Sequence, residues 1–188
     1  RMVQRKDVSY AAALHLSKDL MPEAILEKVS FISRANIIDS LRELVGIKGN
    51  LPSQLSEAID DYVKICHLRH CAVHRFGKLG AGNAIALGFG DHKELLEKPL
   101  NLNYAALQDA IAVAKGLVTT INNFLFNALV ARLPESTWTG TYVLDRPVFY
   151  GYYKLFADKA SASPTGPPKK LYEGLMKARK DFNSAKKN

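Results

Sequence analysis

The segment from Tyr104 to Leu133 reads YAALQDAIAVAKGLVTTINNFLFNALVARL, and its apolar side chains recur at three- and four-residue spacing. This is the period of an α-helix with a wide apolar stripe that packs against other helices. The preceding Asn101-Leu102-Asn103 offers an N-cap, because an asparagine side chain can accept a hydrogen bond from the first helical turn. Pro134 cannot continue the helix. We therefore expect one long helix from about Tyr104 to Leu133.

Three more helices are expected upstream, from the same periodicity. The first covers about Lys6–Leu20, and the second is one long amphipathic helix that ends near Gly46 after starting close to Pro22. The third begins at Pro52 and Ser53, runs through His74 and ends near Gly77 or Gly80. The glycine-rich residues 77–90 are expected to form an ordered loop or a short irregular insertion. Short connections between these helices predict an all-α fold, an antiparallel helical bundle of four to five helices.

The character of the chain changes after Pro134. Aromatic and β-branched residues cluster over 134–159, a composition that leaves open a hairpin, a short helix with an arm, or part of a partner surface. Residues 160–168 have the serine, glycine and proline content of a linker. Residues 169–188 predict a short basic helix. The expected organisation is a helical bundle over 1–133, an aromatic-rich C-terminal appendage over 134–159, a linker and a basic C-terminal helix.

Composition places the chain among globular proteins, and its charge is compatible with a polyanionic partner. Of its 188 residues, 47% are hydrophobic and 23% are charged, which is enough to form a core and excludes a disordered or fibrous class. The formal net charge is +8, and the sequence pI is about 9.5. A basic excess of this kind favours partners such as nucleic acid or anionic lipid, although basic tails are often simply solvated.

The two cysteines and the hydropathy of the sequence indicate the cellular compartment of the protein. Cys66 and Cys71 lie five positions apart in a predicted helix, so they point in different directions and a disulfide between them is disfavoured. We expect two free thiols, which suit a reducing cytoplasm. No apolar run approaches the roughly 18 residues of a membrane span, and no signal peptide pattern is present. The sequence thus predicts a cytoplasmic protein with no membrane partner.

The chemistry-bearing segment is Cys66-His67-Leu68-Arg69-His70-Cys71-Ala72-Val73-His74-Arg75-Phe76-Gly77. On a helix, His67, His70 and His74 lie at i, i+3 and i+7, which is one face. Arg69 is about 140° from His74 around the axis, and its long side chain can still reach toward that face. Histidine serves as a general acid or base near neutral pH, and arginine matches the geometry and charge of a phosphate.

Arg69-His70-x-x-x-His74 near the end of a bundle helix resembles the Arg-polar-x-x-x-His motif of the HEPN domain family, ribonucleases of toxin and defence systems. The apolar pair Ala72-Val73 and the upstream residues 31–41 also resemble that family, and the likeness covers roughly residues 5–133. It implies an endoribonuclease that needs no metal or cofactor and cleaves through attack of the RNA 2′-hydroxyl, to give a 2′,3′-cyclic phosphate and a 5′-hydroxyl.

The resemblance also implies roles and partners. His74 would be the general base or acid, Arg69 the phosphate clamp and His70 a supporting polar residue. A homodimer through the motif helices would bring two copies of the motif together, with a regulatory or antitoxin partner as a further possibility. Some toxins of the family carry a tyrosine two residues after the motif histidine, where a partner enzyme modifies it. Phe76 stands at that position here, which puts that form of control in doubt.

Further residues are candidates for RNA binding because they are cationic or polar and lie near the predicted groove. They are Arg34, Asn36, Arg75 and Lys78. A second hypothesis from another class is a non-catalytic HEPN-like module that dimerises or binds nucleotide or RNA within a larger assembly.

The motif and the glycines after it allow three other interpretations. The three histidines could bind zinc, although structural zinc normally takes four ligands from more than one segment. They could also be solvated polar residues at a helix end, with Arg69 and His74 stabilising its C-terminus. The stretch from Gly77 to Gly82 lacks the strand-loop-helix context and the ending of a phosphate-binding loop, so that interpretation is rejected.

Overall fold

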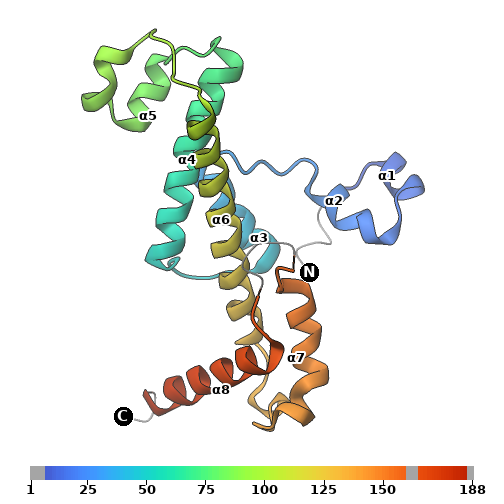
Figure 1. Cartoon of the computed structure of the whole chain (residues 1–188). Helices are drawn as coiled ribbons and strands as arrows, with labels where there is room; N and C mark the ends of the chain where they lie inside the picture. Colours follow the sequence, from blue (N-terminus) through green and yellow to red (C-terminus); the bar gives the residue numbers. More distant parts are fainter. Residues whose placement is uncertain (1–6, 160–164, 186–188) are drawn as a thin grey trace. The chain divides into compact units, whose positions relative to one another are not determined.

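The computed structural model describes residues 7–159 and 165–185, and within these ranges the chain is all-α with no strand (Figure 1). The helices form two compact units, residues 1–120 and 121–188, and the division falls within one long helix. The all-α fold expected from the sequence is confirmed. None of the helices in the described ranges combines the length and apolarity needed to cross a bilayer.

The first unit contains five helices and the beginning of a sixth. They are α1 (Tyr10–His15), α2 (Met21–Leu26), α3 (Arg34–Val45), α4 (Ser53–His74), α5 (Ala81–His92) and α6 (Tyr104–Val130). The 22 residues of α4 form the central rod of this unit, beside α3 and antiparallel to the first half of α6 (Figure 1). Short 3-10 turns follow α1 at Lys18–Leu20 and α5 at Lys93–Leu95.

Two small apolar clusters hold α4 in place. At its N-terminal half, Leu55 and Ile59 are fully buried, as is Ile37 of α3, and Leu41 of α3 is buried as well. At its C-terminal half, Cys71 packs with Leu79, which precedes α5, and with Ala84 of α5. Cys71 is therefore a core residue, and both cysteines are free thiols as expected. One side of the C-terminal end of α4 is therefore packed against other residues, and its other side is exposed to solvent.

The expected long helix from Pro22 to Gly46 was wrong, since the chain leaves helical conformation between Leu26 and Arg34. Ser33 is extended, and its hydroxyl accepts a hydrogen bond of 3.2 Å from the backbone N–H of Asn36. Serine competes with helix continuation in this way and starts a new helix instead. The first predicted helix is also shorter than expected, because α1 ends at His15.

Residues 77–90 were expected to form an ordered loop or a short irregular insertion, but Ala81–His92 is helical. Gly88 interrupts the helix with φ 111°, a conformation that suits glycine. Burial of Ala84 and the packing of Leu87 against Cys71 and Leu79 outweigh the low helix propensity of the three glycines within α5.

The predicted cap of α6 is confirmed, since Asn103 Oδ1 accepts a 2.9 Å hydrogen bond from Ala106 N.

The second unit contains the end of α6 with α7 (Tyr142–Phe156) and α8 (Pro168–Ala185). The aromatic-rich extension, for which a hairpin and a helix were both open, is thus mainly a helix preceded by a 3-10 turn at Glu135–Thr137. Its core is aromatic, with the Phe149 ring 6.3 Å from Phe126 and 5.5 Å from Tyr172, both edge-on. Residues 160–164 of the predicted linker lie outside the described residues, and the helix α8 covers Pro168–Ala185 in the region of the expected basic helix.

A buried carboxylate organises this second unit. Asp145, 2% exposed, accepts hydrogen bonds from the backbone N–H groups of Thr139 and Gly140 and from the Thr139 hydroxyl. The hydroxyl of Tyr172 on α8 donates a further hydrogen bond of 2.5 Å. Through these hydrogen bonds, Asp145 connects the loop before α7 to α8. Its role is therefore structural.

Two pKa shifts in this network predict a pH window of stability. Burial by itself raises the pKa of Asp145, but the hydrogen bonds from Tyr172, Thr139 and Gly140 outweigh it and leave the pKa below its ordinary value. Burial and the Asp145 carboxylate raise the pKa of Tyr172. The Asp145 contribution is present above about pH 4 and lost as pH falls through its lowered pKa. The Tyr172 contribution is present below about pH 10 and lost as pH rises further.

We therefore expect the urea concentration at which half of the second unit is unfolded to stay constant between about pH 4 and about pH 10. It should fall at lower and at higher pH. Equilibrium unfolding followed by Trp138 fluorescence over a pH series measures it, because Trp138 is the chain's one tryptophan and its ring lies 6.3 Å from Tyr172. A Tyr172→Phe variant should lose the part of the alkaline fall that this phenol causes. An alkaline fall that is identical in both proteins would contradict the assignment.

Candidate functional site

The Arg69-His70-x-x-x-His74 segment occupies the last two turns of α4, and His74 is the final helical residue. Immediately afterwards the chain reverses, because Phe76 (φ 54°) and Gly77 (φ 77°) adopt left-handed conformations. The backbone N–H groups of Arg75 and Gly77 both donate to the carbonyl of Cys71, at 3.1 Å each. The motif therefore lies at a well-formed helix C-terminus, whose dipole favours positive charge.

Arg69, His70 and His74 are all exposed to solvent. The rings of His70 and His74, one helical turn apart, have centroids 5.0 Å from each other and an interplanar angle of 47°. Two imidazoles at this separation can act on the same small group, such as a phosphodiester and its flanking hydroxyl. The structure thus brings together the two histidines of the predicted catalytic set, with Arg69 on the neighbouring side of the helix.

His67, the third histidine of the segment, is oriented differently. Its Nδ1 lies 3.2 Å from Oδ1 of the buried Asn83 on α5, so the imidazole holds α5 against α4. Since an amide oxygen only accepts, Nδ1 carries the proton in this contact. Among the described residues no three histidine, cysteine, aspartate or glutamate side chains gather in a way that would hold a metal ion.

The face of α4 that carries Arg69 extends back through Cys66 and Tyr62, at successive spacings of three and four residues. Burial raises the pKa of Tyr62, a hydrogen bond with Cys66 raises it further, and the positive charge of Arg69 opposes both. Tyr62 is therefore neutral at physiological pH. Val73, 57% exposed, continues the same face beside Arg69 and His70.

Arg75 and Lys78, predicted to bind RNA, follow the motif closely but differ in their surroundings. The Arg75 guanidinium donates to Glu97 Oε1 at 2.5 Å, and its side chain lies across Gly80, where a Cβ atom would collide with it. Lys78 is exposed in the loop. That loop is fixed to the segment before α6 by backbone hydrogen bonds of Leu79 with Lys98 and Glu97, at 3.1 and 2.9 Å.

Removing the Glu97 charge should release Arg75 for phosphate. We expect Glu97→Gln to tighten binding of single-stranded RNA at low salt by roughly two- to fivefold and to steepen its salt dependence by about one phosphate contact. Fluorescence anisotropy with a labelled oligonucleotide over a salt series measures both. The matched control is Glu94→Gln, an exposed carboxylate of the same segment. Equal effects of the two substitutions would show that only net charge matters.

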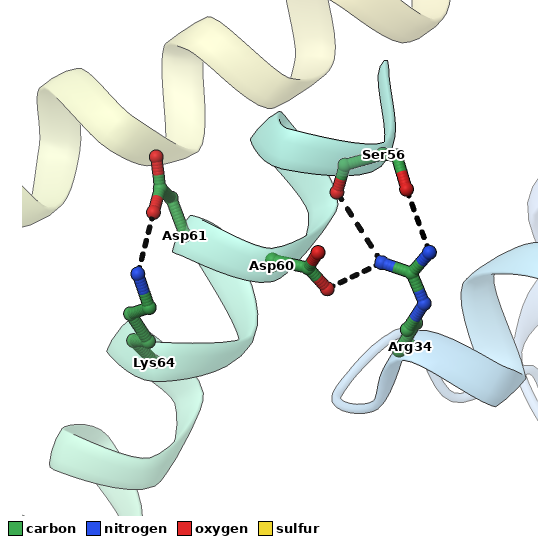
Figure 2. A network of polar contacts seen from close by, with 5 residues as sticks. All are labelled: Arg34, Ser56, Asp60, Asp61 and Lys64. Atoms are coloured by element: carbon green, nitrogen blue, oxygen red, sulfur yellow. Dashed lines mark hydrogen bonds and ion pairs between the residues drawn. The ribbon is translucent and has the colours of Figure 1, made fainter. Parts of the chain in front are cut away.

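Arg34 and Asn36 lie elsewhere. The Arg34 guanidinium donates to Ser56 Oγ at 2.6 Å, to the Ser56 carbonyl and to Asp60, as Figure 2 shows. Asp60 is roughly 14 Å along the α4 axis from Arg69, by the 1.5 Å rise per residue. Arg34 thus ties α3 to the N-terminal half of α4, where Asp61 and Lys64 form a further exposed pair at 2.9 Å (Figure 2). The structure does not bring these two residues to the motif.

A pocket of about 580 Å³ opens beside Arg69, and the sequence alone did not indicate it. α4 and the first turns of α6 form two of its walls, and the segment between Leu100 and Asn103 forms the third. Its lining residues are Ile65, Leu68, Arg69, Ala72, Leu100, Asn101, Leu102, Asn103, Tyr104, Ala106, Leu107 and Ala110. The Asn101-Leu102-Asn103 stretch is the nearest sequence signal, but its pattern predicts a helix cap and not the wall of a pocket.

Around the axis of α4 the pocket and the histidines lie on opposite sides of Arg69. With 100° per residue, Ile65, Leu68 and Ala72 are about 40–100° to one side of it, and His70 and His74 about 100–140° to the other. Around the helix axis, Arg69 therefore lies between the residues that line the pocket and the two histidines.

Comparison of the chain with models of protein families, with curated proteins and with solved structures found no match.

Proposed function

We propose that the chain is a metal-independent endoribonuclease of the HEPN type. The observation that carries this proposal is the exposed pair of imidazoles of His70 and His74, 5.0 Å apart at the end of α4, with the cationic Arg69 beside them. Cleavage of RNA by its own 2′-hydroxyl needs a base, an acid and positive charge on the phosphorane. Histidine can serve as the base or the acid, and arginine supplies the positive charge.

In this mechanism one imidazole removes the proton of the 2′-hydroxyl as its oxygen attacks the phosphorus. The bond from phosphorus to the 5′-oxygen breaks, and an imidazolium donates the proton that this leaving oxygen needs. Arg69 stabilises the charge on the non-bridging oxygens. In the symmetric pair of chains proposed below, His74 of one copy is the base and His74 of the other copy is the acid, and His70 orients His74 or the phosphate. The products are a 2′,3′-cyclic phosphate and a 5′-hydroxyl.

We propose further that two copies of the chain meet through their motif helices. Val73 is 57% exposed and Phe76 is 98% exposed next to the motif, and exposed apolar side chains of this kind favour a protein partner. A symmetric pair would place both motifs in one cleft, so each chain contributes its own Arg69 and His74. A regulatory or antitoxin partner remains a prediction from the family resemblance.

A second candidate function is a non-catalytic module that binds nucleotide or RNA. The pocket beside Arg69 favours it, because an apolar cavity with one cation on its wall also suits a nucleotide that is held and not cleaved.

Cleavage in the presence of excess chelator separates the two functions. We expect the intact chain to cut single-stranded RNA under these conditions and to leave cyclic phosphate ends, identified by mass spectrometry of the fragments. Binding without cutting, at a concentration where sedimentation shows a dimer, would support the module and contradict the nuclease.

A further inference from the structure

The pocket beside Arg69 has the chemistry of a site for a planar apolar group attached to an anion. Its side chains are mostly aliphatic, and Tyr104 adds an aromatic ring that is 77% exposed at the mouth. Arg69 is the one charged residue among the described residues that line it, and no carboxylate does. A volume of about 580 Å³ lies within the usual range for sites that bind small molecules.

The mouth of the pocket also has polar groups that can form hydrogen bonds with the edge of a ligand. Asn101 and Asn103 lie on the segment that forms one wall. Asn103 uses its Oδ1 to cap α6, so its amide nitrogen keeps donor capacity for a further partner. An apolar cavity with few oriented polar groups at its rim is how proteins commonly bind nucleobases and similar heterocycles.

We infer that this pocket binds a nucleobase of the RNA strand, next to the phosphate that Arg69 holds, an inference that rests on the proposed function. With the phosphate on the guanidinium, the histidines face the reacting oxygens from one side of α4. The attached nucleotide then places its base on the other side, in the pocket. Charge favours RNA over an apolar peptide as the occupant, because a cation lies on the wall and the whole chain carries a net charge of +8.

Ala110 on α6 offers a way to fill the pocket without touching the motif. It is half-buried and lines the cavity, so a leucine there occupies part of its volume. Ala105 provides a matched control, since it is an exposed alanine of the same helix that does not line the pocket. Both substitutions keep good helix formers, so helix content should not change.

The test uses the full chain and 2′-O-methyl RNA oligonucleotides, which lack the attacking hydroxyl and are bound without cleavage. One oligonucleotide carries every base, and the others each carry one abasic position. We expect one abasic position to weaken binding by about tenfold in the intact protein, the scale of one lost stacked base. Ala110→Leu should bind the complete oligonucleotide about tenfold more weakly and show no further loss at that position, and Ala105→Leu should behave as the intact protein.

Equal affinities for the complete and abasic oligonucleotides, or an unchanged affinity of Ala110→Leu, would overturn the inference. A change of sedimentation mass in Ala110→Leu alone would overturn it too, because the pocket would then be an interface between copies. If the chain cleaves RNA but its binding does not depend on the base, nucleobase binding in the pocket is refuted and the proposed nuclease function is not. If binding depends on the base but no RNA is cleaved, the nuclease function is refuted and nucleobase binding is not.

Discussion

Replacement of His74 by alanine, and separately of Arg69 by alanine, is expected to reduce RNA cleavage by about 10²- to 10⁴-fold. Loss of His74 removes a proton acceptor or donor, a contribution of roughly 10²–10⁴ in rate. Loss of Arg69 removes the charge that stabilises the transition state, a contribution of roughly 10²–10³. Initial rates of cleavage of a fluorescent RNA, measured with excess chelator, test both.

Both side chains are exposed and at a helix end, so neither substitution should unfold the chain. His15 on α1 is an exposed histidine away from the motif, and His15→Ala is the matched control for His74→Ala. Arg42→Ala, an exposed arginine of α3, serves the same purpose for Arg69→Ala. Cleavage that persists in His74→Ala at the rate of His15→Ala would refute the proposed mechanism.

Asp145→Ala should destabilise the second unit by about 3 kcal/mol. The substitution removes a buried carboxylate and leaves the backbone N–H groups of Thr139 and Gly140 and the hydroxyl of Tyr172 without their acceptor. Unsatisfied buried donors cost about 1–3 kcal/mol each, and partial access of water limits the sum. Urea unfolding followed by Trp138 fluorescence at neutral pH should show the loss as a lower midpoint.

Two variants show whether the network and not the loss of charge is responsible. Tyr172→Phe removes one hydrogen bond and should cost about 1 kcal/mol. Glu173→Ala removes an exposed carboxylate of α8, 3.9 Å from Lys169, and should change the free energy of unfolding by less than about 0.5 kcal/mol. A midpoint in Asp145→Ala equal to that of Glu173→Ala would show that the network does not stabilise this unit.

The helices that the sequence predicted best are those with strong periodicity and clear end signals. α4 begins at Ser53, as Pro52 before it indicated, and it ends at His74, a few residues before the glycines at which the sequence predicted its end. α6 begins at Tyr104 after the Asn103 cap. In both helices the local signals and the apolar stripe favour the same structure, so local preference and tertiary packing agree.

Predictions failed where two local signals competed. The apolar spacing continues from Ile25 to Leu44, but Ser33 caps a new helix and interrupts it. Glycines suggested a loop over 77–90, but Ala84 and Leu87 find an apolar partner in Cys71, and α5 forms around that contact. The competition is decided by burial, which depends on residues that lie far along the chain.

For the candidate site, the sequence by itself determined that Arg69, His70 and His74 occupy the end of one helix, because a period of 3.6 residues fixes their relative directions. Only the tertiary structure decided that His67 turns to Asn83, that Arg34 pairs with Asp60 and Arg75 with Glu97, and that a pocket opens beside Arg69. The buried network of Asp145 belongs to the same group, since Tyr172 lies 27 positions away. The reason is physical: a helix sets the direction of its own side chains, but the partner that each side chain meets depends on how separate elements pack.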